Sequence, residues 1–332
     1  MQILLAGRTP DQLDTEIKAR APDAVIRQWS VTGDIETMRD QVRAADVVLI
    51  AADAAGDRRI VGELAAAPRL RFVQLAFAGH DWLRPAMLPA GCAVSNTHEH
   101  SSAIGEYVLA SILDATVRLG AIDAAFRSGS WAHSGTTGRG IKHGLLQGKT
   151  VGIVGYGHIG RDVARRLAPF GVEILAQGRE AVDPPPAPLA RFAGPEGLDD
   201  LLGRSDFIVL SCALNEATRG LIDVAAFDRM KPDAVLVNVS RGPVVEERAL
   251  FEALRERRIR RAYIDVWYQY PTAATPHPRP GSFPFEELDN LVMTPHCSAW
   301  TEGQEQRRCD FLAENIARWV HGEPPLNRIA LA

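Results

Sequence analysis

Val151-Gly-Ile-Val-Gly155-Tyr-Gly157-His-Ile-Gly160 is the stretch of sequence that decides the fold. An apolar run leads into its three glycines, and apolar residues at helical spacing (Ile159, Val163 and Leu167) follow them. The pattern GxGxxG between a strand and a helix is typical of dinucleotide binding. Its first glycine allows a tight turn, the second lets a pyrophosphate approach the backbone, and the third permits close packing of helix on strand. The sequence therefore predicts a Rossmann unit in which the N-terminus of the helix, at His158 and Ile159, binds phosphate.

Strands and helices alternate on the C-terminal side of this motif. The strand candidates are Thr150–Val154, Val172–Ala176, Asp206–Cys212, Ala234–Val239, Ala262–Val266 and Leu291–Thr294. They are rich in Val and Ile and almost free of charge, which is typical of parallel strands buried on both faces. Helical stretches lie between them, at Ile159–Pro169, Leu198–Leu202, Val224–Arg229 and Glu246–Arg258. Six strands in this order predict a doubly wound nucleotide-binding domain.

The first hundred residues repeat the alternation on a smaller scale. Short apolar runs lie at Ile3–Ala6, Ala24–Trp29, Asp46–Ala52, Arg71–Phe77 and Ala93–Asn96. The fold class predicted for the chain is α/β, with two doubly wound parallel-sheet domains: the Rossmann domain and a flavodoxin-like substrate domain. One long helix, Ser101–Ser128, is expected to link them.

The domain boundaries follow from the last helical pattern. After His296 comes an amphipathic stretch with Phe311, Leu312, Ile316 and Trp319 on one face, which we expect to return to the first domain. The substrate domain is therefore predicted to comprise residues 1–99 and 299–332, and the dinucleotide-binding domain residues 100–298.

Composition excludes several classes of protein. The chain has 332 residues, 46% of them hydrophobic, and a net charge of −4, which argues against a nucleic-acid partner. No apolar run approaches the roughly 18 residues of a membrane helix, and the four cysteines show no paired spacing, so we expect a cytoplasmic protein with no membrane partner. No metal site is predicted, because the pair His98 and His100 has no evident third ligand.

The end of the second Rossmann strand bears on the choice between NAD and NADP. An acidic residue about 20 positions after the glycines normally binds the ribose 2′-hydroxyl. Gly178 stands at that place and Arg179 follows it. A missing carboxylate beside an arginine favours NADP, whose 2′-phosphate a guanidinium can bind, while Glu180 leaves NAD open.

Polar segments follow three of the later strands, and the carboxyl ends of parallel strands meet at one edge of a sheet. These segments and several other motifs occur along the chain in the order found in one family. The sequence therefore resembles the D-isomer-specific 2-hydroxyacid dehydrogenases. Besides the glycine motif, the matching segments are Ala78-Gly79-His80-Asp81, Gly105-Glu106-Tyr107, Gly129-Ser-Trp131, Ala213-Leu-Asn-Glu-Ala-Thr218-Arg-Gly, Asn238-Val-Ser-Arg241-Gly242-Pro-Val-Val-Glu246, Tyr263-Ile-Asp265-Val-Trp267 and Thr294-Pro295-His296.

The resemblance implies an oxidoreductase that transfers a hydride between NAD(P)H and a 2-keto acid or D-2-hydroxy acid. Arg241 would bind the substrate carboxylate, with the backbone of Ala78 and Gly79 on its other side, and His296 would be the acid/base group. It also implies a homodimer paired through the nucleotide domains, with Trp131 near the interface. Further cofactor contacts are implied at Cys212, Ala213, Thr218, Val239, Ser240 and Asp265.

The sequence departs from the family at one catalytic position. The family usually has a glutamate, paired with the histidine, five residues after the strand-end aspartate, and that place is occupied by Tyr270. A nearby carboxylate would raise the pKa of His296, so its loss predicts reduction that favours acidic pH. We expect Tyr270 to bond and orient His296, while Glu286 or Glu287, in or beside the proline-rich loop that follows, could substitute for the glutamate.

Three alternatives stay open at this stage. The missing glutamate would suit a dinucleotide-sensing corepressor with little turnover, although such a protein needs neither Arg241 nor His296. A formate dehydrogenase-like enzyme needs no proton transfer, and Gln269 lies one residue from the glutamine of that group. Separately, Trp267, Tyr268, Tyr270 and Trp300 could form an aromatic substrate pocket or belong to the core.

Overall fold

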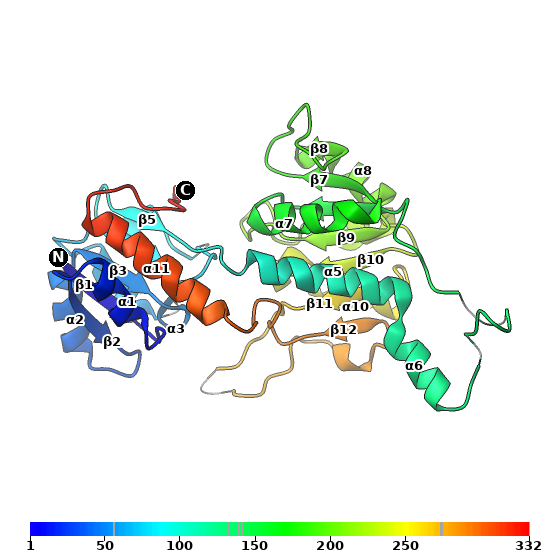
Figure 1. Ribbon diagram of the computed structural model, residues 1–332, viewed down its shortest axis with the longest axis horizontal. Coiled ribbons are helices and arrows are strands. Elements are labelled where there is room, and N and C mark those ends of the chain that lie inside the picture. Colours follow the sequence, from blue (N-terminus) through cyan, green and yellow to red (C-terminus); the bar gives the residue numbers. More distant parts are fainter. Residues whose placement is uncertain are drawn as a thin grey trace. The chain divides into compact units, whose positions relative to one another are not determined.

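The computed structural model describes residues 1–55, 57–80, 82–131, 133–138, 140, 142–272 and 275–331. The chain divides into two compact units, each described here by itself (Figure 1). Unit 1 consists of Met1–His100 and Thr301–Ala332, and unit 2 consists of Ser101–Trp300.

Unit 1 is built on a five-stranded parallel sheet. Its strands are β1 (Gln2–Ala6), β2 (Val25–Trp29), β3 (Val47–Ile50), β4 (Phe72–Leu75) and β5 (Ala93–Ser95). They lie in the order β2-β1-β3-β4-β5, which is the flavodoxin-like order with its switch point between β1 and β3.

Helices cover both faces of this sheet, as a doubly wound fold requires. On one face lie α1 (Leu13–Arg20) and α11 (Gln304–Val320), and on the other lie α2 (Ile35–Ala44) and α4 (Arg58–Leu64), with the short α3 (Ala52–Ala55) after β3. Figure 1 shows α11 beside α1. A buried amide pair secures α11, because Asn315 Nδ2 donates to Gln74 Oε1 at 2.6 Å on β4.

Unit 2 is built on a larger parallel sheet. Its strands are β6 (Thr150–Val154), β7 (Glu173–Gln177), β8 (Arg191–Ala193), β9 (Phe207–Leu210), β10 (Val235–Asn238), β11 (Arg261–Ile264) and β12 (Leu291–Met293). The order β12-β11-β10-β9-β6-β7-β8 is doubly wound about β6 and β9. The predicted fold class is confirmed. The prediction of six strands missed β8, a three-residue edge strand flanked by proline-rich sequence.

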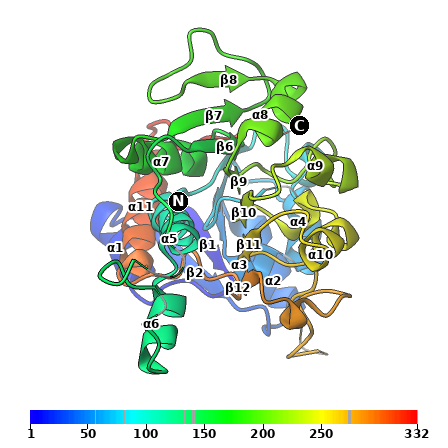
Figure 2. The same cartoon turned by 90° about the vertical axis from the view of Figure 1, so that its right-hand side faces the viewer.

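The helices of unit 2 also divide between the faces of the sheet. On one face lie α5 (Ser101–Val117) and α7 (His158–Leu167), and on the other lie α8 (Leu198–Arg204), α9 (Val224–Arg229) and α10 (Glu247–Arg255) (Figure 2). Short 3₁₀ turns occur at Pro85–Met87, Ala168–Phe170, Pro195–Gly197, Gly242–Val244 and Phe285–Glu287. Among the described helices, none is long and apolar enough to cross a bilayer.

The prediction of one helix over Ser101–Ser128 is wrong. The chain turns at Arg118, whose φ of +60° is left-handed, and a second helix, α6 (Leu119–Arg127), follows. The reason lies in burial: Ile112 and Ala115 are in the core, whereas Leu119 is 69% exposed. The apolar stripe that keeps α5 on the sheet therefore ends before Leu119.

Candidate active site

The glycine turn after β6 has the geometry that its sequence predicts. Gly155 has φ +93°, and a Cβ on it would lie 2.5 Å from the backbone of Cys212, so only glycine fits between β6 and β9. A Cβ on Gly160 would lie 2.3 Å from the carbonyl oxygen of Gly155. These contacts hold α7 close to the strand.

Gly157 differs from the other two glycines because a Cβ on it would meet nothing within 4 Å. It is the N-cap of α7, a ten-residue helix that begins at His158 and has no side-chain cap at its N-terminus. Open space in front of a helix N-terminus fits a pyrophosphate, which the N–H groups and the positive end of the helix dipole favour. The residues present therefore fit the dinucleotide that the sequence implies.

The turn after β7 explains why no acidic residue stands there. A Cβ on Gly178 would lie 2.7 Å from the ring of Phe192, which itself packs edge-on against Tyr156 with ring centroids 5.3 Å apart. The next two side chains, Arg179 and Glu180, are exposed. An arginine is therefore available at this turn, and a carboxylate at position 178 would require Phe192 to move.

The loops after β9 and β10 are held by their own side chains. Thr218 donates its hydroxyl to the Ala213 carbonyl at 2.7 Å and fixes the first loop. In the second, Asn238 Oδ1 accepts from both the N–H and the hydroxyl of Ser240, at 3.0 and 2.7 Å. Val239 and Ser240 are themselves buried.

Arg241 follows this loop and is half-buried. Its guanidinium donates to the carbonyl of Ser240 at 2.8 Å. The next residue, Gly242, fixes the position of the loop, because a Cβ there would lie 2.3 Å from the carbonyl oxygen of Trp267. This close approach brings the loop after β10 against the segment after β11.

The loop that carries His296 is organised by Asp265, which is fully buried at the end of β11. One carboxylate oxygen accepts from the hydroxyl of Thr294 at 2.6 Å and the N–H of Cys297 at 2.8 Å, and the other accepts from the N–H of Ser298 at 2.9 Å. Both oxygens are thus occupied by the loop around His296. The observed bonds of Asp265 position the histidine loop, and its contact with a cofactor stays a prediction.

Tyr270 contacts His296 directly. The phenol oxygen lies 3.0 Å from Nδ1 of the histidine, and the same oxygen accepts the N–H of Trp267 at 3.1 Å. Gln269 is exposed, and Glu286 pairs with Arg279 at 3.0 Å. In the described part of the chain, the hydrogen-bond partner of His296 Nδ1 is therefore a neutral hydroxyl.

The electrostatics of His296 follow from these neighbours. Loss of water around the ring lowers the pKa of His296 below its ordinary value; Asp265 acts in the opposite direction and Arg241 in the same one. Burial raises the pKa of Tyr270, so it stays protonated near neutrality. His296 itself has a left-handed φ of +57°. The histidine is therefore mainly neutral at physiological pH.

In unit 1 the predicted substrate-binding segment follows β4. The carbonyl of Ala78 accepts from Asn96 Nδ2 at 2.7 Å, while the N–H groups of Ala78 and Gly79 donate to no other described residue. Free, adjacent N–H groups are suited to a carboxylate. Asp81, the last residue of this motif, lies outside the described residues.

The sequence left open whether four aromatic residues near the site form a substrate pocket or belong to the core. Trp267 is buried and donates its indole N–H to the Thr294 carbonyl at 2.8 Å, and Tyr268 stacks on Phe285 in the core. Trp300 is 87% exposed. The structure therefore assigns Trp267 and Tyr268 to the core.

Several positioning residues were missed by the sequence prediction. Each is a polar residue at the end of an apolar strand or on a helix facing it: Asn96, Tyr107, Asn238 and Thr294. The hydroxyl of Tyr107 lies 2.7 Å from that of Thr294, and Thr294 in turn bonds Asp265. A polar residue in place of an apolar one at a strand end was the signal available. For a metal, no group of three or more His, Cys, Asp or Glu side chains that could bind an ion occurs in the described ranges.

Comparison with known proteins bears directly on this geometry. Residues 109–298 match the family described as D-isomer specific 2-hydroxyacid dehydrogenase, NAD binding domain. The chain is 31% identical to the glyoxylate reductase/hydroxypyruvate reductase of Homo sapiens, covering 100% of this chain and 98% of that protein. The chain belongs to the D-isomer-specific 2-hydroxyacid dehydrogenase family.

Two further comparisons concern a longer relative and a solved structure. A D-3-phosphoglycerate dehydrogenase of Mycobacterium bovis is 35% identical over 94% of this chain, but the chain spans only 56% of that relative. A solved D-isomer specific 2-hydroxyacid dehydrogenase from Xanthobacter autotrophicus, in complex with NADPH and MES, is 25% identical, with a TM-score of 0.76 and coverage of 99% and 98% of the two chains.

Proposed function

We propose that the protein reduces 2-keto acids to D-2-hydroxy acids, and catalyses the reverse oxidation, with a nicotinamide dinucleotide. One observation carries the proposal: the phenol oxygen of Tyr270 lies 3.0 Å from Nδ1 of His296. Arg241 is close enough to both side chains to lower their pKa values. A guanidinium beside an imidazole supplies the two charges that a 2-keto acid requires: one for its carboxylate and one for the oxygen that gains a proton.

Arg241 binds the substrate carboxylate in this proposal. Its charge is permanent near neutral pH, and its planar group can contact both carboxylate oxygens. The position of the group is set by the bond to the Ser240 carbonyl and by Gly242 against Trp267. The N–H groups of Ala78 and Gly79 are the second set of donors for the same carboxylate.

His296 is the proton donor for reduction in this proposal. A bound nicotinamide dinucleotide would supply the hydride for C2 of the substrate, and the turn at Gly155–Gly160 would hold its pyrophosphate. The substrate oxygen then takes a proton from Nε2 of the protonated histidine. Because the pKa of His296 is lowered, the protonated form is lost at a lower pH than usual. Reduction should accordingly be fastest on the acidic side of neutrality.

NADP is the proposed dinucleotide. Gly178 leaves no carboxylate at the ribose position, and the exposed Arg179 is free to bind a 2′-phosphate. A carboxylate at position 178 would repel that phosphate, and here the ring of Phe192 stands in its way. The related Xanthobacter protein was solved with NADPH.

A homodimer paired through unit 2 is part of the proposal. Leu119 and Phe126 on α6 are 69% and 53% exposed, and Trp131 just after it is 62% exposed. The rings of Phe126 and Trp131 are in edge-to-face contact at 4.9 Å. Large apolar side chains gathered on one exposed helix are typical of an interface.

The test measures oxidation of NADPH and of NADH with glyoxylate, hydroxypyruvate and phenylpyruvate from about pH 5 to about pH 9. We expect turnover that His296→Gln lowers by about 10²- to 10⁴-fold, while the matched control His321→Gln, an exposed histidine in unit 1, leaves it unchanged. Tight dinucleotide binding without turnover of any keto acid would contradict the proposal and favour a dinucleotide sensor.

A further inference from the structure

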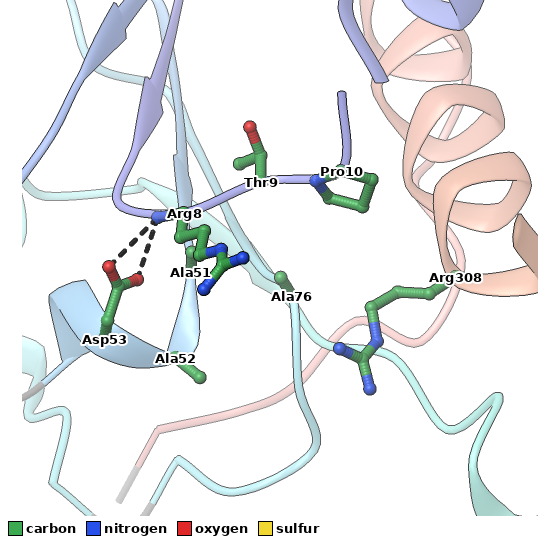
Figure 3. Close-up of a pocket in the computed structure, with 8 residues that line it drawn as sticks. All are labelled: Arg8, Thr9, Pro10, Ala51, Ala52, Asp53, Ala76 and Arg308. Atoms are coloured by element: carbon green, nitrogen blue, oxygen red, sulfur yellow. Dashed lines mark hydrogen bonds between the residues drawn. The ribbon is translucent and has the colours of Figure 1, made fainter. Parts of the chain in front are cut away.

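Unit 1 contains a cavity of about 200 Å³ whose lining residues have no role in the reaction proposed above. It lies at the carboxyl ends of β1, β3 and β4, and Arg8, Asp53, Ala76 and Arg308 are among the residues that line it (Figure 3). This end of the sheet, between β1 and β3, is the topological switch point, where open α/β sheets bind their ligands. Ligand pockets for whole molecules measure about 300–1,000 Å³, so this cavity suits one small chemical group.

The charge in the cavity is positive. Figure 3 shows the guanidinium of Arg8 entering from the end of β1 and that of Arg308 entering from α11. The carboxylate of Asp53 is turned to the backbone N–H of Arg8, which it accepts at 2.9 and 3.1 Å. Two cations and one anion leave a net charge of about +1 on the lining side chains.

The two guanidinium groups lack the partners that arginines in this protein usually have. Neither Arg8 nor Arg308 forms an ion pair or a side-chain hydrogen bond with another described residue. By contrast, the exposed Arg307, the neighbour of Arg308 in the sequence, donates to the Thr301 hydroxyl at 3.3 Å. Burial lowers the pKa of Arg308, and only Glu305, one turn away on α11, opposes this effect. A half-buried cation without a counter-ion is unfavourable unless an anion binds to it.

Three of the other lining residues have small side chains, and one of them is close in sequence to the proposed substrate-binding segment. Ala51, Ala52 and Ala76 leave the space between the arginines open. Ala76 is two residues before Ala78, so their Cα atoms are at most about 7 Å apart. A molecule of a few carbons bound at Ala78 and Gly79 can therefore extend toward Arg8 and Arg308.

We propose that this cavity binds the terminal anionic group, a carboxylate or a phosphate, of a 2-keto acid whose C1 carboxylate is held at Ala78 and Gly79. The inference rests on the proposed reductase function and narrows its substrate class to keto acids with two anionic ends. Arg8 and Arg308 are the residues that determine this specificity.

The kinetic experiment uses pairs of substrates that share a carbon skeleton and differ in the terminal charge. We compare kcat/KM for 2-oxoglutarate with that for 2-oxopentanoate, and for 3-phosphohydroxypyruvate with that for hydroxypyruvate, in the full-length protein. The two pairs distinguish a terminal carboxylate from a phosphate. We expect one of the doubly charged substrates to be preferred, and Arg308→Met to lower its kcat/KM by about ten- to a hundred-fold while changing kcat/KM for the singly charged partner less than about two-fold.

The matched control is Arg307→Met, which removes the same charge from the adjacent, exposed position of α11. It should leave the preference intact, and Arg8→Met should reduce it as Arg308→Met does. A binding measurement that needs no turnover accompanies the kinetics: calorimetric titration with glutarate and, as the match with a single charge, pentanoate. Glutarate should bind to the wild type and lose about ten-fold in affinity in Arg308→Met.

The outcomes separate the inference from the function on which it rests. Turnover of glyoxylate or hydroxypyruvate with no preference for a second charge, or a preference that survives Arg308→Met, would overturn the inference and keep the reductase function. Binding of glutarate that depends on Arg308, without turnover of any keto acid, would overturn the reductase function and retain the cavity as a dianion site. Equal loss of preference in Arg307→Met would overturn the assignment of the arginines.

Discussion

The hydrogen bond between Tyr270 and His296 has a direction that the structure allows to be worked out. The phenol oxygen already accepts the N–H of Trp267, and its own proton has Nδ1 of His296 as its acceptor. A phenol that donates to Nδ1 stabilises the neutral imidazole with its proton on Nε2, since the imidazolium carries a proton on Nδ1 and cannot accept. Replacing Tyr270 with Phe should therefore raise the pKa of His296.

The size of the effect follows from the exposure of the bond. A neutral hydrogen bond contributes roughly 0.5–1.5 kcal/mol in net terms. Tyr270 is 42% exposed, so water competes for both partners and the lower half of that range applies. About 0.5–1 kcal/mol corresponds to a factor of roughly two to five in the protonation equilibrium of His296, and so to a displacement of well under one pH unit.

Two measurements test this reasoning. The pH dependence of kcat/KM for reduction should extend to slightly more alkaline pH in Tyr270→Phe, and ¹⁵N NMR of the histidines should show His296 losing its preference for the Nε2-protonated tautomer. The control is Tyr268→Phe, because the Tyr268 hydroxyl donates to the Val245 carbonyl at 3.0 Å and does not contact His296. A titration of His296 that moves to lower pH in Tyr270→Phe would refute the assigned direction of the bond.

Three further perturbations have expected outcomes. Asp265→Asn removes the charge and replaces one of the two oxygens that together accept three hydrogen bonds, which should cost about 1–3 kcal/mol of unfolding free energy in denaturant titration. The lost charge should also lower the pKa of His296 and move reduction to more acidic pH, a change that a purely structural role would not cause. Arg179→Ala should raise KM for NADPH about ten-fold and leave KM for NADH nearly unchanged, and equal effects on both would contradict binding of the 2′-phosphate. Phe126→Asp should yield a monomer in sedimentation velocity, and a persistent dimer would exclude α6 as the interface.

The sheets and the glycine turn were predictable because they are encoded locally. Buried parallel strands are runs of Val, Ile and Leu, and the requirement for glycine at 155 and 160 comes from contacts within one strand–turn–helix unit. The break at Arg118 was not predictable in this way. Helical spacing continues through Leu119 in the sequence, and only the end of the covered surface stops α5. Strand β8 was missed because three residues at a sheet edge carry too short a pattern.

The candidate site shows the same division between local and distant information. The sequence predicted Tyr270 at the place where the family usually has a glutamate, but the partner of its hydroxyl depends on where Trp267 and His296 meet in space. The bonds of Asp265 to residues 29 to 33 positions away also could not be read from the sequence. Together these contacts suggest a division of labour. The buried carboxylate of Asp265 supplies negative charge near His296, although it binds the loop rather than the ring, and the phenol of Tyr270 orients the ring. Because charge and orientation now come from different residues, the two functions should be separable by mutation: Asp265→Asn and Tyr270→Phe should displace the His296 titration in opposite directions.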